Sequence, residues 1–308
     1  MILTICPNPS IDCTIELDNL NVGMLNRIDS KVETYSGKAL NVAMGVARLG
    51  GESFATGFMF ENHAKMFEHV LDKEGVKHRF IYNAGNARTN YKIIDKRSML
   101  TEINDKGEAV MQDRQAELVD LVEKISPEFD IAVMSGSLPK GIASSFYGQV
   151  LKAIPDRVKV IVDTEKDNML SAIGSREIFM AKPNLRELES FTGERVVDLH
   201  DMVKASRKYI DMGVKCVLLS LGADGAVLTD GTESFFCKSA SVAVNSTVGA
   251  GDSMVAAACV ALSDGKPMPE LLRSAVAAGT ASVTTSGTKL FYYDKYKEIY
   301  AKIHSERI

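Results

Sequence analysis

The chain has 308 residues, of which 36 are basic and 40 are acidic, so its formal net charge at neutral pH is -4. This slightly acidic balance disfavours nucleic acid as the main partner, because nucleic-acid-binding proteins present a basic surface. It does not exclude a phosphorylated metabolite, whose binding depends on local basic residues. The length fits one large or two small domains, with enough chain to bury an ample core.

The cysteine pattern and the N-terminus indicate a protein of a reducing compartment. Five cysteines are scattered without a C-x-x-C pair, which argues against a disulfide framework and against a zinc site. We expect them to be small buried hydrophobes. The first residues lack the basic start of a signal peptide, and no apolar run approaches the length of a membrane span. We therefore expect a cytoplasmic protein without a membrane partner.

In chain order, the pattern in the first third of the chain predicts one buried strand, one helix and several strands with one face exposed to solvent. Residues 1–7 read as the first strand, and the apolar pattern over 39–49 predicts a helix. Apolar and polar residues alternate in four further segments, namely Cys13 to Leu17, Arg27 to Thr34, Tyr91 to Asp95 and Met99 to Ile103. Lys96 and Arg97, between the last two, suggest a hairpin turn.

From about residue 130 onward, short apolar runs alternate with helical patterns. Strands are expected at 130–135, 158–163, 177–182, 216–221 and 226–229. Helices are expected at 142–154, 166–173, 254–262, 268–285 and 292–304. Continuous β-branched runs such as 158–162 are typical of strands buried on both faces of a parallel sheet. We predict one α/β domain over 1–308, with a small β lid inserted from about 12–35 and 88–110.

The most informative motif lies between an alternating segment, 241–245, and the apolar helical run that follows it. Gly249 and Gly251 flank Ala250 and leave amide N–H groups uncovered where a helix begins, which makes an anion site. Asp252 adds a carboxylate beside that site, and this is costly unless the carboxylate accepts a proton from an attacking hydroxyl. A plain helix N-cap is an equally good interpretation of the motif taken alone.

Polar clusters at other predicted strand ends are candidate ligand sites, because open α/β sheets bind ligands there. Gly37 frees the backbone before the first helix, Lys38 can meet a phosphate, and Asn41 carries a donor and an acceptor for sugar hydroxyls. Without other support, a helix start with a solvated lysine is the simpler interpretation. Ser137 lies in a strand-to-helix loop that could equally be an ordinary turn.

Two arginines and two further loops complete the set of candidates. Arg88 offers a bidentate fork for phosphate, and Arg27 on another lid segment could add charge, although isolated surface arginines are common. Asn184 and Glu187 stand three apart at a helix start, so they could hold waters around Mg²⁺ or simply cap the helix. The glycines after Ser220 could admit a nucleotide or form a hairpin turn.

Absent motifs narrow the choice of enzyme class. The chain has no G-x-G-x-x-G after the first strand and no G-x-x-x-x-G-K-[ST], which disfavours a Rossmann dehydrogenase and a P-loop NTPase. It also lacks H-E-x-x-H and G-x-S-x-G, the signatures of zinc proteases and of α/β-hydrolases.

Taken together, these motifs resemble the ribokinase-like carbohydrate kinases, also called the phosphofructokinase-B family, over nearly the whole chain. Residues 247–252 resemble the family's C-terminal signature, and Asn184 to Glu187 resemble its N-x-x-E element. Residues 36–41 resemble the G-G-K-G-x-N element of the branch that acts on phosphorylated ketohexoses, such as 1-phosphofructokinase and tagatose-6-phosphate kinase. Ser36 and Ala39 stand where that pattern has glycine, which puts the substrate in question more than the catalysis.

The resemblance implies a ribokinase-like fold and ATP and Mg²⁺ as cofactors. It implies transfer of the γ-phosphoryl group to a ketohexose monophosphate, foremost fructose 1-phosphate to give fructose 1,6-bisphosphate. The alternatives are tagatose 6-phosphate or fructose 6-phosphate as substrate, a non-catalytic sugar-phosphate sensor, and a nucleoside or vitamin kinase. The half-polar lid strands also suggest a homodimer through the lid.

The resemblance also implies a role for each candidate residue. Asp252 is the base, the anion hole is formed by Gly249, Ala250 and Gly251, and Asn184 with Glu187 places Mg²⁺ through water. The substrate-binding set is Asp12, Arg27, Gly37, Lys38, Asn41, Arg88, Asn90 and Ser137, in which Asp12 and Asn41 hold sugar hydroxyls. The nucleotide-binding set is Ser220, Gly222, Gly225, Thr247, Gly249 and Gly251.

Overall fold

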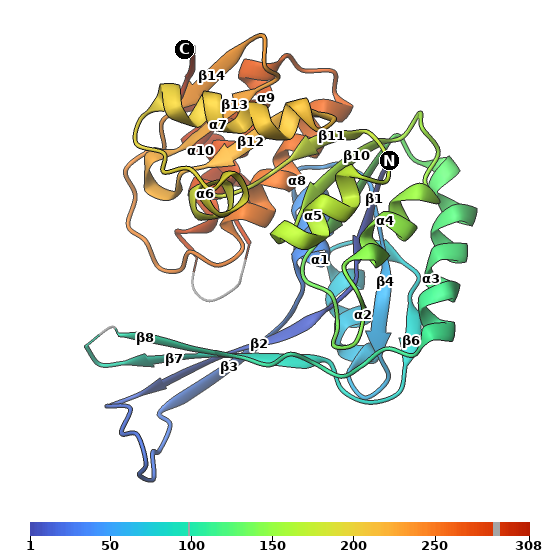
Figure 1. Ribbon diagram of the computed structural model, residues 1–308. Helices are drawn as coiled ribbons and strands as arrows, with labels where there is room; N and C mark the ends of the chain where they lie inside the picture. Colours follow the sequence, from blue (N-terminus) through green and yellow to red (C-terminus); the bar gives the residue numbers. More distant parts are fainter. Residues whose placement is uncertain (98, 286–289) are drawn as a thin grey trace.

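The computed structural model describes residues 1–97, 99–285 and 290–308 of the chain. A large sheet is flanked by helices on both faces, and a separate small sheet projects away from this body (Figure 1). The predicted fold class, a mostly parallel α/β sheet with a second small sheet, is confirmed.

The large sheet has a parallel centre and an antiparallel end. In the described residues its strand order is β15-β14-β13-β12-β11-β10-β9-β1-β4-β5, with β6 also paired to β4. Pairing is parallel from β5 through β12, and antiparallel from β12 to β15. The strands are β1 (Ile2–Cys6), β4 (Ser53–Phe60), β5 (Lys77–His78), β6 (Ile81–Asn83), β9 (Ile131–Ser135), β10 (Lys159–Asp163), β11 (Ile178–Ala181), β12 (Val214–Ser220), β13 (Ala226–Thr229), β14 (Ser234–Cys237) and β15 (Ser305–Arg307).

Two helical layers cover the sheet because each helix buries an apolar face against it. One layer contains α1 (Lys38–Arg48), α8 (Ala250–Ser263), α9 (Met268–Ser282) and α10 (Tyr293–Lys302). The other contains α3 (Gln112–Ile125), α4 (Ser145–Lys152), α5 (Lys166–Ile173), α6 (Leu185–Thr192) and α7 (Leu199–Asp211). The remaining helices are α2 (Ala64–Lys73), which packs against β5 and the small sheet, and the short turns η1 (Ser126–Glu128) and η2 (Gly222–Asp224).

The small sheet has the strand order β3-β2-β7-β8 in the described residues. Its strands are β2 (Ser10–Leu17), β3 (Ser30–Ser36), β7 (Arg88–Asp95) and β8 (Leu100–Asn104). Strand β2 pairs antiparallel with β3 and parallel with β7, and β7 pairs antiparallel with β8. The predicted hairpin with Lys96 and Arg97 in its turn is therefore confirmed.

The expected elements agree well with the structure, with one correction and several omissions. The expected helix 166–173 and strand 226–229 match α5 and β13 to the residue. The alternating segment 241–245 forms no strand, because Asn245 N–H donates to the carbonyl of Val283 at the end of α9 rather than to a neighbouring strand. The sequence reasoning did not identify the helices α2, α3 and α7, nor the strands β4, β5, β6, β14 and β15.

All five cysteines are buried and unpaired, as expected. Among the described residues, no helix combines the length and the apolar character that crossing a membrane requires.

Close pairing of β1 with β4, near one end of the large sheet, depends on Gly57 of β4. Gly57 pairs with Cys6 and has a φ of 136°, and a Cβ at this position would lie 1.9 Å from the carbonyl oxygen of Cys6. We expect Gly57→Ala to lower the free energy of unfolding by about 3 kcal/mol, since the strands must move apart. Gly75, with a φ of 71° and open space around it, is the matched control.

Gly75→Ala should cost only about 1 kcal/mol, the penalty of a left-handed backbone for a residue with a Cβ. Urea unfolding of both variants measures the difference. Equal losses in the two variants would show that the contact with Cys6 is not the cause.

Candidate active site

The candidate site lies at the edge of the large sheet where the parallel strands end. Because β1, β9, β10, β11 and β12 run in one direction, the residues that end or follow them share that edge. These residues include Asn8, Ser137, Asp163, Lys182 and Ser220. Helices α1 and α8 begin beside them.

The start of α8 has the features of an anion site. Gly249 is the N-cap with a φ of 80°, and the N–H groups of the first turn have no acceptor within the helix. A Cβ on Gly251 would lie 3.2 Å from the ammonium nitrogen of Lys182. Glycine at this position therefore lets a lysine ammonium approach the positive end of the helix closely. Two sources of positive potential meet at this point.

Asp252, in the first turn of α8, is buried and does not cap the helix. Its Oδ2 instead accepts a hydrogen bond of 2.7 Å from Nδ2 of Asn41 on α1. Burial raises the pKa of Asp252 to about 6, and the negative charge of Asp163 adds to this effect. The hydrogen bond from Asn41 and the charges of Lys38 and Lys182 act in the opposite direction. The helix-cap interpretation is therefore wrong, and the carboxyl group titrates in a range suited to a general base.

A buried charge cluster lies beside Asp252. The Asp163 carboxylate, which is 1% exposed, has Lys38 Nζ at 3.2 Å from one oxygen and Lys182 Nζ at 3.5 Å from the other. Burial alone would raise the pKa of Asp163, but the two ammonium groups outweigh it and hold that pKa below its ordinary value. The sequence reasoning missed Asp163 and Lys182, although each stands at the end of a predicted strand.

The two lysines of the cluster differ in how far their side chains are exposed to solvent. The Lys182 side chain is only 5% exposed, whereas that of Lys38 is 44% exposed. The charge of Asp163 raises the pKa of Lys38, so this ammonium stays protonated. Lys182 is thus fixed in place, and Lys38 can turn toward a ligand while remaining positive.

Ser36 links the small sheet to the buried carboxylate of Asp252. Its hydroxyl donates to Oδ1 of Asn41 at 3.2 Å, and this fixes the amide so that Nδ2 faces Asp252. Ala39, the other departure from the family pattern, is fully buried in the core. Gly37 precedes α1, and a Cβ there would meet the Cys6 sulfur at 2.8 Å.

A chain of polar contacts continues along one face of the small sheet. Strand register places Ser36 and Arg88 on either side of Ser10, and Asp12 beside Asn90 two residues further along. Nδ2 of Asn90 donates to Asp12 at 3.0 Å, and Arg88 donates to Oδ1 of Asn90 at 3.3 Å. The Nε of Arg88 is buried without a partner. The predicted residues Asp12, Arg88 and Asn90 are therefore in mutual contact.

Asn8 is a further polar residue that the sequence reasoning missed. Its Nδ2 lies 3.4 Å from Oγ of Ser137 and 3.2 Å from the carbonyl of Leu138. Asn8 thus holds the loop that carries the predicted residue Ser137. Its position directly after the first strand was the available signal.

Asn184 and Glu187 form a capping box at the start of α6, each bonded to the other's backbone N–H at 2.9 Å. Glu187 also contributes to the raised pKa of Lys38, after Asp163 and Asp252, so its charge reaches the cluster. No group of three potential metal ligands occurs among the described residues. This set fits a hydrated Mg²⁺ held mainly by nucleotide phosphates, because Mg²⁺ keeps several waters.

The residues predicted to bind the nucleotide are less closely grouped. The backbone N–H of Ser220 donates to Pro183, which brings β12 next to Asn184. A Cβ on Gly222 would meet nothing within 4 Å, so this glycine borders open space. A Cβ on Gly225 would lie 2.0 Å from the Cys237 carbonyl oxygen, so strand packing explains that glycine without a nucleotide.

Thr247 and Arg27 are both exposed. Thr247 lies in the irregular segment before α8. Arg27 lies in the connection between β2 and β3, at the end of the small sheet that points away from the body (Figure 1). Within this one chain, Arg27 is thus separate from the charge cluster.

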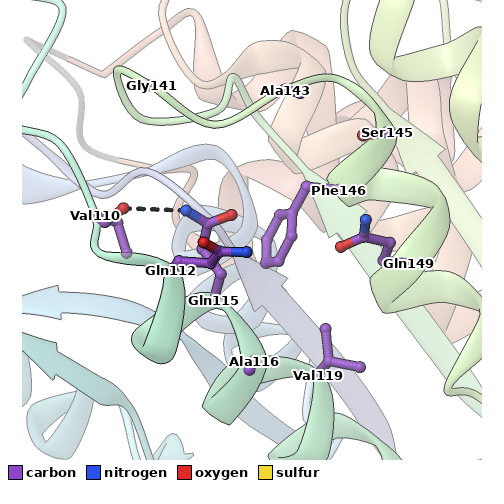
Figure 2. Close-up of a pocket in the computed structure, with 10 residues that line it drawn as sticks. All are labelled: Val110, Gln112, Gln115, Ala116, Val119, Gly141, Ala143, Ser145, Phe146 and Gln149. Carbon is purple, nitrogen blue, oxygen red and sulfur yellow. Dashed lines mark hydrogen bonds between the residues drawn. The ribbon is translucent and has the colours of Figure 1, made fainter.

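A cavity of about 520 Å³ between α3 and α4 is a different place from the site just described (Figure 2). Figure 2 shows Gln112, Gln115, Phe146 and Gln149 around it. Among the described residues, the ten that line this cavity are all uncharged. It therefore offers no cation for a phosphate, and the cluster around Asp252 is the better candidate.

Comparison with known proteins identifies the family of the chain. A family model described as pfkB family carbohydrate kinase matches residues 8–294. The chain belongs to the pfkB family of carbohydrate kinases. It is therefore a phosphotransferase whose acceptor is a hydroxyl group of a sugar, and kinases of this family use ATP with a divalent metal.

Several relatives of this pfkB kinase act on sugar phosphates. It is 32% identical to the 1-phosphofructokinase of Xanthomonas campestris over 270 residues, which cover 85% of this chain and 84% of that enzyme. It is 29% identical to the tagatose-6-phosphate kinase of Staphylococcus epidermidis over 98% of both chains. A crystal structure of phosphofructokinase-2 from Escherichia coli with substrates and products superposes with a TM-score of 0.91, at 28% identity and 98% coverage of both chains.

The raised pKa of Asp252 predicts the acid side of the pH profile. Only the ionised carboxylate can accept a proton, so kcat/KM should fall about tenfold per pH unit below about pH 6. Initial rates from about pH 5 to pH 9 measure this limb. A profile that stays flat down to about pH 5, as the ordinary aspartate value of 3.8 would give, would contradict the assignment.

Substrate phosphates also titrate near pH 6, so a variant must separate the two effects. Asp163→Asn removes a negative neighbour that raises the pKa of Asp252. The limb should therefore move to lower pH in this variant if it belongs to Asp252, and stay in place if it belongs to the substrate.

Proposed function

We propose that this kinase transfers the γ-phosphoryl group of MgATP to a hydroxyl of a ketohexose monophosphate, foremost fructose 1-phosphate to give fructose 1,6-bisphosphate. The observation that carries the proposal is the buried Asp252 carboxylate at the start of α8, next to the lysine cluster. A carboxylate in that position is useful to an enzyme that must deprotonate a hydroxyl beside a phosphate.

The chemical step uses the groups around the start of α8. Asp252 accepts the proton of the attacking hydroxyl, and Asn41 holds the carboxylate in position through its 2.7 Å hydrogen bond. The N–H groups of Gly249, Ala250 and Gly251 stabilise the charge on the transferred oxygens. Lys182, held by Asp163, and Lys38 offset the same charge. The transition state is loose, so alignment and charge supply most of the catalysis.

The substrate's own phosphate is assigned to the small sheet. Arg88, with its unpartnered buried Nε, and Asn90 supply donors, and Asp12 accepts from a sugar hydroxyl. Lys38 was predicted to join this phosphate site. Its contact with Asp163 and its electrostatic interaction with Asp252 favour a role at the transferred group instead.

Mg²⁺ would lie near Glu187 and Asn184, with water in between, and when bound it neutralises the nucleotide phosphates. The two capping residues are held rigidly by their reciprocal hydrogen bonds. They can therefore orient waters without changing their own positions. Ser220 and Gly222, next to this pair, are assigned to the nucleotide.

The competing functions fit the site less well. A sugar-phosphate sensor has no use for a buried carboxylate whose pKa is raised to about 6. A nucleoside or vitamin kinase needs no cation for a substrate phosphate, which leaves Arg88 without a role. Relatives named 1-phosphofructokinase and tagatose-6-phosphate kinase favour the ketohexose phosphates.

The small sheet is proposed to act as a lid and as the contact between two copies. It carries large exposed hydrophobic residues that a second lid would cover, namely Val22, Met24, Leu25, Ile28, Val32, Leu100 and Ile103. Exposed apolar area of this kind marks interaction surfaces. Because the relatives are metabolic enzymes, we propose that the enzyme works in the cytoplasm.

The first test is the rate of ADP release with equal concentrations of fructose 1-phosphate, fructose 6-phosphate and tagatose 6-phosphate. We expect fructose 1-phosphate to give the highest kcat/KM. A higher value for one of the other two would replace the substrate and keep the reaction. No turnover with any of the three would contradict the function.

The variant Asp252→Asn tests the chemical step. The amide keeps the shape of the side chain but cannot accept the proton, so kcat should fall about 10²–10⁴-fold. Sugar-phosphate binding, measured by calorimetry, should persist.

A second pair of variants separates the two proposed phosphate sites. Lys38→Met removes a charge next to Asp163, so we expect kcat to fall by about 10²-fold with the smaller change in sugar KM. Arg88→Ala should raise the sugar KM by about tenfold or more with the smaller change in kcat. The opposite pattern would return Lys38 to the substrate-phosphate site.

A further inference from the structure

Lys92 of β7 is a buried lysine that no role assigned so far explains. Its side chain is 9% exposed, and its ammonium nitrogen is buried without a hydrogen-bond partner. Lysine is rarely buried so deeply unless it is paired, because its charge is strongly hydrated in water.

The carboxylate near Lys92 is that of Asp12. Nζ of Lys92 and Oδ2 of Asp12 are 3.6 Å apart, and the Asp12 side chain is 7% exposed. The other oxygen of Asp12 accepts from Asn90 at 3.0 Å. Both oxygens of Asp12 therefore face positive or donor groups of β7. Glu102, the register partner of Lys92 on β8, is exposed and makes no ion pair with it in the described part of the chain.

Strand geometry brings these groups onto one face. Residues two apart on a strand share a face, so Arg88, Asn90 and Lys92 form a line along β7. Asp12 is the register partner of Asn90 on the parallel neighbour β2. The contacts run without a break from Arg88 to Asn90, from Asn90 to Asp12, and from Asp12 to Lys92.

From this arrangement we propose that Lys92 is a positioning residue, which holds the Asp12 carboxylate in the orientation that receives the sugar hydroxyl. The proposal rests on the function given above, in which Asp12 binds the sugar. The ammonium, 3.6 Å from one oxygen of Asp12, prevents the carboxylate from turning toward Arg88. A carboxylate fixed in this way accepts from a hydroxyl of one configuration better than from its epimer, so Lys92 contributes to substrate choice.

The test is a double-mutant cycle with kinetics on fructose 1-phosphate, or on whichever of the three sugar phosphates the wild type uses best. Lys92→Met keeps the length of the side chain and removes its charge. We expect it to raise the sugar KM about tenfold or more, while kcat and the KM for ATP change less than about threefold. In an Asp12→Asn background, Lys92→Met should add less than about threefold, because its target is gone.

Two further variants exclude a general effect on folding. Lys92→Arg keeps the charge and should restore the sugar KM to within about threefold of wild type. Lys96→Met removes an exposed ion pair with Asp18 between the ends of the same two strands, and should leave KM unchanged. If Lys92→Met does not fold, Lys92→Gln replaces it with the same expectation.

The outcomes separate the two proposals. A wild type without turnover on any sugar phosphate would overturn the function itself. A working wild type with an unchanged sugar KM in Lys92→Met would overturn the role of Lys92 alone. An equal KM increase in the wild-type and Asp12→Asn backgrounds would also overturn it, since Lys92 would then act without Asp12.

Discussion

The site depends on one fully buried carboxylate, Asp163, held between two ammonium groups. Removing a single partner from such a buried arrangement usually costs about 3–5 kcal/mol, because a charge is left without compensation. The three charges are therefore stable only as a set in which each compensates another. Here Lys182 is fixed against the start of α8 by Asp163, and Lys38 can move. Asp252, the proposed base, lies beside this cluster, and burial is the main cause of its raised pKa.

The sheet topology explains how groups far apart in sequence reach this point. Parallel strands β1, β9, β10, β11 and β12 end at one edge, and each contributes its next polar residue. The small sheet is attached to the same edge through Ser36, whose hydroxyl orients Asn41 toward Asp252. The polar contacts of the small sheet and those of Asp252 are therefore connected through strands β2 and β3.

Much of the fold and part of the site could be predicted from the sequence. The β-branched runs identified the parallel strands, and the glycine pair marked the anion site, because both signals are local. Asp163 was missed because its importance comes from pairing with Lys38, more than a hundred residues away in the sequence. Lys182 was missed because its importance comes from its contact with Asp163 and from its closeness to Gly251 at the start of α8. Gly225 was assigned to the nucleotide, but the approach of Cys237 explains it, and only the strand packing reveals this contact. The segments β4, α2, α3 and α7 carried no distinctive motif, so nothing local distinguished them.

A crystal structure with the sugar phosphate and a non-hydrolysable ATP analogue tests the central claim most directly. The account predicts that the attacking hydroxyl lies within about 3 Å of an Asp252 oxygen, as a general base requires. It also predicts that the γ-phosphate oxygens face the N–H groups of Gly249 to Gly251 and the ammonium of Lys182. A hydroxyl bound to another base, or a γ-phosphate away from the start of α8, would contradict it.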